Sequence, residues 1–187
     1  MARVQFSEML GVVLHSPAVN ADERGTFTKY FERDLTRLDE SVSCLNSLSM
    51  ATNDETGTLR GLHFQISPYQ EEKVIICLRG AIFDVIVDLR EGSPTIGKWA
   101  SIELKSNQPA SLFLPKGFAH GYQTLTPDTS VFYGLSSEYL PEKARSLKFS
   151  DGDLNISWPL PVSQISLKDS QGISLIQALA VANGPSS

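Results

Sequence analysis

The 187-residue sequence is poor in cysteine and has no long apolar run, and both shortages exclude classes of protein. Its cysteines, Cys44 and Cys77, form no Cys-x-x-Cys motif, and Cys77 falls in an apolar strand pattern where a reduced, buried thiol is expected. The longest apolar run near the start, 9–14, is too short for a secretory signal, and nothing approaches a membrane span. We therefore expect a cytoplasmic protein that does not contact membrane.

Positive charge is also in short supply. The chain has 16 Lys and Arg against 21 Asp and Glu, a formal net charge of −5. This balance argues against broad contact with nucleic acid or with an anionic membrane. Any anionic ligand must therefore be met by local basic residues, which fits a small anion better than a polyanion.

The overall composition predicts one globular domain. Hydrophobic residues make up 41% of the chain and charged residues 20%, which suits a single sizeable core without disorder. We expect one domain over 1–187, with a core over about 10–170 and a C-terminal helix and tail over about 171–187.

Short strand patterns recur about every ten residues in the second half of the chain, with no long helix between them. This pattern predicts a β-sandwich or a small barrel. Further strands are expected at 12–19 and 59–65, and short peripheral helices at 31–38 and 173–181. The strands expected after residue 68 are 73–78, 81–89, 98–104, 111–114, 121–125 and 130–135.

The segment 81–89 alternates with period two, so its side chains divide between two faces. One face is wholly apolar, whereas the other carries Asp84 and Asp88 beside two isoleucines. A place at the rim, with bonds to turn amides, is as good an explanation for Asp88 as a functional role. The same explanation is weaker for Asp84, which lies in the middle of the strand.

The stretch 57–65 places a cation and an imidazole, Arg60 and His63, three residues apart among glycines and apolar residues. A buried cation needs an anion, and a histidine in such surroundings is suited to moving protons. The stretch therefore indicates an anionic substrate and acid–base chemistry.

Segments 57–63 and 115–120, each ending in a histidine, resemble in part the paired histidine motifs of cupins, which are small double-sheet barrels. A metal-binding cupin would have a second histidine where this chain has Gln65, and Glu71 or Glu72 offers only a doubtful carboxylate ligand. We favour a barrel without metal or other cofactor, and keep a metal-dependent cupin enzyme as an alternative.

Such a barrel would bring candidate site residues together from several strands. Each has an ordinary structural explanation when taken singly, such as a core histidine or a surface lysine. Together, a base, a phenol and a cation in a water-poor pocket can remove a proton next to a carbonyl, stabilise the enolate and return the proton from the other side. The candidates are His63, His120, Arg60, Lys73, Asp84 and Tyr133.

The chain resembles the dTDP-4-dehydrorhamnose 3,5-epimerase family of deoxysugar biosynthesis over about residues 24–169. No single motif is specific, but their order and spacing are. The resemblance implies an all-β fold, a cupin jelly-roll barrel (double-stranded β-helix) with a few short peripheral helices. The motifs are Asp22-x-Arg24-Gly25-x-Phe27, Leu59-Arg-Gly-Leu-His-Phe-Gln65, Asp84-Val-Ile-Val-Asp88-Leu-Arg90 with Ser93-Pro94-Thr95, Pro115-x-Gly-Phe-Ala-His120-Gly, Tyr133 with Tyr139, Trp158-Pro159, and Ser166-x-Lys168-Asp169.

The resemblance also implies catalytic roles in an isomerase that acts on a nucleotide-diphospho-4-keto-6-deoxyhexose. His63 would remove the proton next to the C4 ketone, and Asp169 would orient its imidazole. Tyr133 would return a proton on the opposite face, so that C3, C5 or both are inverted. Lys73 would hold the C4 oxygen as it becomes an enolate.

A further set of residues would bind the substrate by the same resemblance. Arg24, Arg60, His120 and Lys168 would chiefly contact the diphosphate, for which guanidinium groups are suited. Tyr139 would stack on the base. Gln65 belongs to the same set, as does Asp84, a plausible partner of His120. Because the family's site borrows the Arg24 segment from the other subunit of a strand-exchanged dimer, a homodimer is implied.

The chain departs from the family pattern at several substrate-contacting positions. Lys29 and Ala144 replace glutamates, and Leu48 and Met50 stand where the family has a Gln-x-Asn pair. Each change would alter recognition by one or a few kcal/mol. A CDP-linked substrate and inversion at C3 alone therefore stay open, as does a sugar-nucleotide-binding protein without catalysis.

Overall fold

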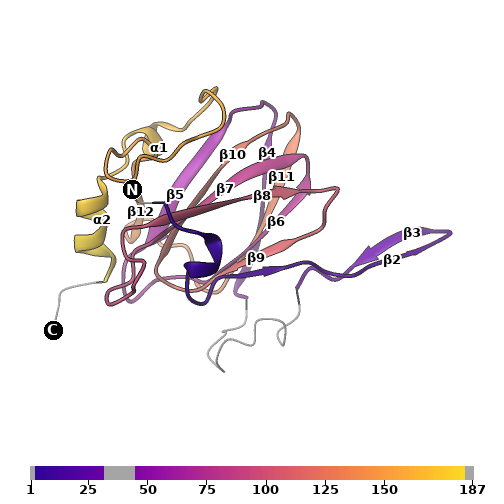
Figure 1. Cartoon of the computed structure of the whole chain (residues 1–187), viewed down its shortest axis with the longest axis horizontal. Coiled ribbons are helices and arrows are strands. Elements are labelled where there is room, and N and C mark those ends of the chain that lie inside the picture. The colour runs from indigo at the N-terminus through magenta and orange to yellow at the C-terminus, as the bar shows by residue number, and fades with distance from the viewer. Residues whose placement is uncertain (1–2, 32–44, 184–187) are drawn as a thin grey trace.

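A computed structural model of the chain describes residues 3–31 and 45–183 (Figure 1). Two five-stranded antiparallel sheets form its body. The first has the strand order β1-β9-β6-β11-β4, with β1 (Val13–His15), β9 (Ser111–Leu114), β6 (Lys73–Arg79), β11 (Thr129–Leu135) and β4 (Ser47–Asn53). The second has the order β12-β5-β10-β7-β8, with β12 (Ala144–Ser146), β5 (Leu59–Gln65), β10 (Phe118–Thr124), β7 (Ala81–Asp88) and β8 (Trp99–Lys105).

The main hydrophobic core lies between the two sheets. Ile75 and Leu112 contribute from the first sheet, and Ile82 and Ile86 from the second, each at most 1% exposed. This arrangement is the all-β jelly-roll barrel that the sequence predicts. Burial on this scale is the dominant stabilising contribution to such a fold.

The predicted division of the 81–89 segment into two faces is confirmed. Ile82 and Ile86 point into the barrel core, whereas Val85 and Val87 belong to a second cluster on the outer face of the same sheet. Helix α2 (Leu175–Ala182) covers that outer face through its buried side chains. Both faces of β7 are therefore buried, which explains its nearly continuous apolar sequence.

Asp88 lies at the end of β7 and binds the turn that follows. Its carboxylate accepts hydrogen bonds from the backbone and side chain of Arg90 and from the hydroxyls of Ser93 and Thr95. Burial would raise the pKa of Asp88, but these bonds lower it below its ordinary value. The structural explanation is therefore the correct one for Asp88.

Some predicted elements differ from those observed. The strand expected at 12–19 is wrong as a single element, because it is broken around Pro17, which lacks the N–H that a continuing ladder needs. The helix expected at 173–181 is confirmed as α2, which begins two residues later and ends one residue later. The helix expected at 31–38 falls, beyond Phe31, outside the described residues.

Several elements were not anticipated. Strand β4 carries serines and a methionine in place of a β-branched run, and β12 is only three residues long. Helix α1 (Leu167–Ser170) has a single turn, and a 3-10 helix, η1 (Phe6–Glu8), lies near the N-terminus. Such elements form because neighbouring strands and caps complete their hydrogen bonds, a contribution that local sequence pattern does not reveal.

A hairpin of β2 (Val19–Asp22) and β3 (Gly25–Thr28) extends away from the barrel (Figure 1). Residues 19–27 are all exposed. No helix in the described ranges, 3–31 and 45–183, has the length and hydropathy needed to cross a membrane.

Candidate active site

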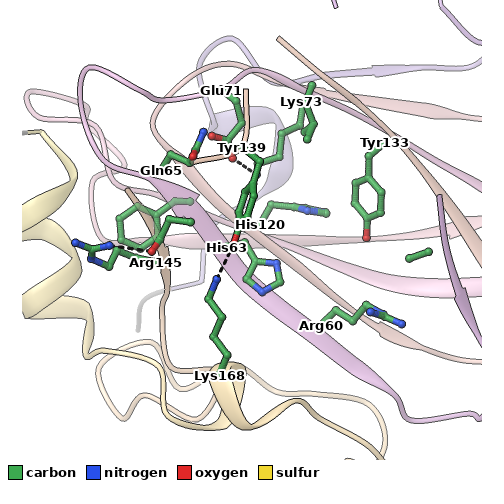
Figure 2. A pocket seen from close by; sticks show the side chains of 14 residues that line it. Arg60, His63, Gln65, Glu71, Lys73, His120, Tyr133, Tyr139, Arg145 and Lys168 are labelled. Carbon is green, nitrogen blue, oxygen red and sulfur yellow. Dashed lines mark hydrogen bonds and ion pairs between the residues drawn. The ribbon is translucent and has the colours of Figure 1, made fainter. Parts of the chain in front are cut away.

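A cavity of about 270 Å³ opens between the two sheets, and most of the predicted site residues line it (Figure 2). Strands β5, β6, β10 and β11 supply its central groups. The lining residues are Ala51, Arg60, His63, Phe64, Gln65, Glu71, Lys73, His120, Tyr133, Leu135, Tyr139, Ala144, Arg145 and Lys168.

His63 forms a dyad with Asp169. The distance from Nε2 of His63 to Oδ1 of Asp169 is 2.7 Å. The side chain of His63 is 45% exposed whereas that of Asp169 is 6% exposed. The dyad therefore has an imidazole that a ligand can reach, supported by a carboxylate behind it.

The local sequence around α1 positions the carboxylate. Ser166 caps the helix by accepting a hydrogen bond from the backbone N–H of Asp169, and the neighbouring Ile165 bridges to Leu59 at the start of β5. An acidic residue in the first turn of a helix is favoured by the free N–H groups there. Residues more than 100 positions apart in sequence are thereby brought into contact.

The Asp169 carboxylate is held in its ionised form. Burial would raise its pKa, but hydrogen bonds from His63, from the Ser146 hydroxyl and from the Gly61 amide hold the pKa at about 2. A carboxylate that stays charged can support a positive charge on the adjacent imidazole.

A second histidine–aspartate pair lies deeper in the barrel. Nε2 of His120 is 2.8 Å from Oδ2 of Asp84, and the two side chains are 4% and 0% exposed. Complete burial raises the pKa of Asp84, and the imidazole of His120 opposes this shift. Asp84 thus lies behind His120 and does not line the cavity.

Tyr133 packs beside His120 and Tyr122. Its ring meets that of His120 edge to face, with the centroids 6.2 Å apart. Burial and the neighbouring Tyr122 phenol raise the pKa of Tyr133 well above its ordinary value. At neutral pH this phenol therefore keeps its proton.

Lys73 begins strand β6 and its Nζ is 2.5 Å from Oε1 of Glu71. Both side chains are 8% exposed. The pair provides a protonated amine in a largely dry part of the cavity, where its charge acts strongly on a ligand.

Arg60 is held by strand β4. Its Nε donates to Oδ1 of Asn53 at 2.7 Å, and Nη2 donates to the carbonyl oxygen of Thr52. Asn53 in turn donates to the Tyr122 hydroxyl. Neither Asn53 nor Tyr122 was identified from the sequence, although the alternation of the two strands that carry them points both inward.

Tyr139 and Lys168 meet at the cavity mouth (Figure 2). Nζ of Lys168 donates to the Tyr139 hydroxyl at 3.1 Å and lies over the ring. Tyr139 is 56% exposed, which leaves aromatic surface for a ligand to stack on.

Gln65 lines the cavity but uses its amide to hold neighbouring loops. Its Nε2 donates to the carbonyl oxygens of Tyr69 and Glu138, and its Oε1 accepts from the backbone N–H of Leu140. These bonds fix the loop that carries Tyr139. The geometry favours a positioning role over direct contact with a substrate.

Arg24 does not reach this cavity within one chain. It lies in the turn between β2 and β3, where its guanidinium pairs with Asp22, and its side chain is 84% exposed. The hairpin extends away from the barrel, so Arg24 is separated from the other predicted site residues (Figure 1).

The departures from the family pattern occupy different places. Ala144 lines the cavity. Leu48 and Met50 flank Ser49, which pairs with Tyr133, so they project from the opposite face of the sheet and are 63% and 60% exposed. Within one chain these two residues do not contact the cavity.

The site also includes groups that the sequence did not single out, one lining the cavity and one behind Asp169. Arg145 lies on β12, and Ser146 supports Asp169 from the same strand. No motif marked them, because β12 was not anticipated. Within the part of the chain that is described, no three His, Cys, Asp or Glu side chains are grouped so that they could hold a metal ion.

Comparison with known proteins points to one family. The family model described as dTDP-4-dehydrorhamnose 3,5-epimerase matches residues 7–177. A dTDP-4-dehydrorhamnose 3,5-epimerase of Sinorhizobium fredii is 41% identical over 167 residues, covering 89% of this chain and 86% of the relative.

Solved structures show the same fold. The dTDP-6-deoxy-D-glucose-3,5-epimerase of Legionella pneumophila, in complex with dTDP-4-keto-L-rhamnose, has a TM-score of 0.85 and 31% identity, covering 99% of this chain and 97% of its own. ChmJ, a 3'-monoepimerase of Streptomyces bikiniensis in complex with dTDP-quinovose, has a TM-score of 0.82 and 29% identity, covering 93% and 89%. The chain belongs to the dTDP-4-dehydrorhamnose 3,5-epimerase family.

Proposed function

We propose that this chain is an epimerase that inverts C3, C5 or both of a dTDP-linked 4-keto-6-deoxyhexose. The observation that carries the proposal is the meeting of the His63–Asp169 dyad, Tyr133 and Lys73 at one cavity. The substrate class comes from the names of the relatives, and these four groups can perform the reaction that those names describe.

His63 acts as the base. Its Nε2 is engaged by Asp169, which leaves Nδ1 to take the proton from the carbon next to the ketone. The ionised carboxylate of Asp169 stabilises the imidazolium that results. The carbon–hydrogen electron pair moves into the new double bond, and the ketone oxygen becomes an enolate oxygen.

Lys73 stabilises that enolate. An ammonium group has three N–H donors, and Glu71 engages one of them. The remaining donors can reach the C4 oxygen as its negative charge develops. In a site with little water, removing such a donor costs roughly 3–4 kcal/mol of transition-state stabilisation.

Tyr133 completes the inversion. Its raised pKa keeps the phenol protonated, so it can deliver a proton to the face of the sugar ring opposite His63. The configuration of the carbon is inverted because one face loses a proton and the other gains one.

Basic and aromatic side chains bind the rest of the substrate. Arg60, His120 and Lys168 would face the diphosphate, and Tyr139 would stack on the nucleotide base.

We also propose a homodimer in which Arg24, on its exposed hairpin, completes the partner's site. The hairpin's projection from the barrel supports this arrangement.

We propose a cytoplasmic location for the protein. The buried free thiol of Cys77 supports it, because free thiols persist in a reducing compartment.

The test is deuterium exchange followed by NMR, with dTDP-linked and CDP-linked 4-keto-6-deoxyglucose compared side by side in D2O. We expect the wild-type chain to introduce deuterium at C3, C5 or both, and faster with the dTDP-linked substrate. His63→Ala should abolish exchange, whereas Tyr133→Phe should suppress net inversion.

His15→Ala is the matched control, because His15 lies on β1 and does not line the cavity. It should leave exchange unchanged. Unaltered exchange in His63→Ala would contradict the assigned base. Tight binding of the substrate by the wild-type chain without any exchange would instead favour a binding protein without catalysis.

A further inference from the structure

Glu71 is a buried carboxylate with an unused hydrogen-bonding atom. Its Oε1 pairs with Lys73, but its Oε2 is buried and has no hydrogen-bond partner among the described residues. A buried acceptor left without a donor costs roughly 1–3 kcal/mol, and more when it is charged. Because Glu71 lines the cavity, a donor on the ligand can remove this cost.

The charge of Glu71 indicates which part of the ligand it faces. Among the described residues that line the cavity it is the single carboxylate, whereas the cations that line it are Arg60, Lys73, Arg145 and Lys168. Figure 2 shows Glu71 and Lys73 on one side of the cavity, well apart from Arg60 and Lys168. A carboxylate repels a diphosphate, so Glu71 must face an uncharged part of the ligand. Because Glu71 pairs with Lys73, which holds the C4 oxygen in the proposed function, that part is the sugar.

The backbone around Glu71 is fixed relative to Tyr133. The Ser136 hydroxyl accepts from the backbone N–H of Glu72 at 2.8 Å, and the backbone N–H of Ser136 donates to the Glu72 carbonyl oxygen. Ser136 directly follows β11, the strand that carries Tyr133. The carboxylate, the amine of Lys73 and the phenol are therefore held by one rigid part of the barrel, as recognition of a small ligand requires.

We infer that Glu71 is a specificity-determining residue that accepts a hydrogen bond from the C3 hydroxyl of the substrate. The inference rests on the proposed function, in which Lys73 donates to the C4 oxygen. A donor and an acceptor side by side match a ketone next to a hydroxyl. In a 4-keto-6-deoxyhexose that hydroxyl is on C3, since C5 carries the ring oxygen and the methyl group.

The experiment compares two variants with two substrates. The substrates are the dTDP-linked 4-keto-6-deoxyhexose and the same molecule lacking its C3 hydroxyl, and deuterium incorporation at C5 is measured for both. Glu71→Gln should lower kcat/KM by about 10- to 100-fold with the hydroxyl substrate, as expected for loss of a hydrogen bond to a charged group. With the deoxy substrate the loss should be about threefold or less, because no hydrogen bond is lost.

Glu71→Asp keeps the charge but withdraws the oxygens, and it gives the same test should the Gln variant fail to fold. Glu91→Gln removes a carboxylate from an exposed turn and should leave both substrates unaffected. An equal loss with both substrates would show that Glu71 acts only through Lys73 and would overturn the inference. No loss would overturn it too. Absence of C5 exchange by the wild-type chain with the hydroxyl substrate would instead limit the proposed function to C3, and the same comparison would then be made on exchange at C3, which carries hydrogen in both substrates.

Discussion

Asp84, Asp88 and Asp169 are three buried carboxylates in three different electrostatic situations. Asp88 receives hydrogen bonds from a turn and supports structure, Asp84 supports His120, and Asp169 supports the exposed imidazole of His63. The pKa of Asp84 is raised by burial, whereas the pKa values of the other two are lowered because their hydrogen bonds outweigh burial. The difference depends on the number of donors that each carboxylate meets.

The depressed pKa of Asp169 predicts how stability depends on pH. A carboxyl group with a pKa of about 2 in the folded state and an ordinary value of 3.8 contributes stability above pH 4. That contribution, about 2 kcal/mol, is lost as the pH falls through the folded pKa. We expect Asp169→Asn to lower the free energy of unfolding clearly at pH 6 and much less at pH 2.5.

Urea unfolding of the wild-type chain and of Asp169→Asn at the two pH values measures this difference. The Asn side chain keeps the shape and most of the hydrogen bonds, so the comparison isolates the charge. An effect of the same size at both pH values would show that the carboxylate's ionisation does not stabilise the fold.

At the scale of elements, the site depends on close contact between β5 and β10. Gly61 of β5 has a φ of +116°, and a Cβ there would lie 2.6 Å from the Cα of Gly121 and 2.7 Å from the His120 carbonyl oxygen. Only glycine tolerates both the dihedral angle and the contact. This approach places His63 opposite His120 in the strand register.

We expect Gly61→Ala to destabilise the fold by more than about 2 kcal/mol, since it combines a strained dihedral with a backbone clash. Gly92→Ala is the matched control. Gly92 has a φ of +75° but nothing within 4 Å of the added Cβ, so its cost should be about 1 kcal/mol. Chemical denaturation of both variants measures the contrast, and equal losses would show that the strand contact is not limiting.

At the scale of the whole molecule, Arg24 stands apart from the cavity on an exposed hairpin. The proposed exchange of this hairpin between subunits predicts complementation. Arg24→Ala and His63→Ala should each be inactive as homodimers. In a mixed dimer one site would carry both changes and the other neither, so an equimolar mixture should recover about a quarter of the wild-type sites.

The mixture would be assayed after the subunits have been allowed to exchange, and unmixed samples treated in the same way are the controls. Recovery of activity only on mixing supports the shared site. If Arg24→Ala is inactive and mixing restores nothing although mixed dimers have formed, the hairpin does not serve the partner's cavity.

The sequence by itself determined the architecture and much of the chemistry. Regular alternation along β7 predicted that its side chains divide between two faces, and the ordered motifs around His63, His120 and Tyr133 predicted a shared site whose residues line one cavity. Periodicity and motif spacing are local properties of a chain, so they can be read without coordinates.

Only the tertiary structure decided which carboxylate supports which group. The sequence does not decide whether Asp88 binds the turn after β7 or has a functional role, and it does not show that Gln65 holds the Tyr139 loop or that Glu71 leaves an oxygen unpaired inside the cavity. The physical reason is that burial and hydrogen-bond partners come from segments far apart along the chain. These partners become defined only when the two sheets close around the core.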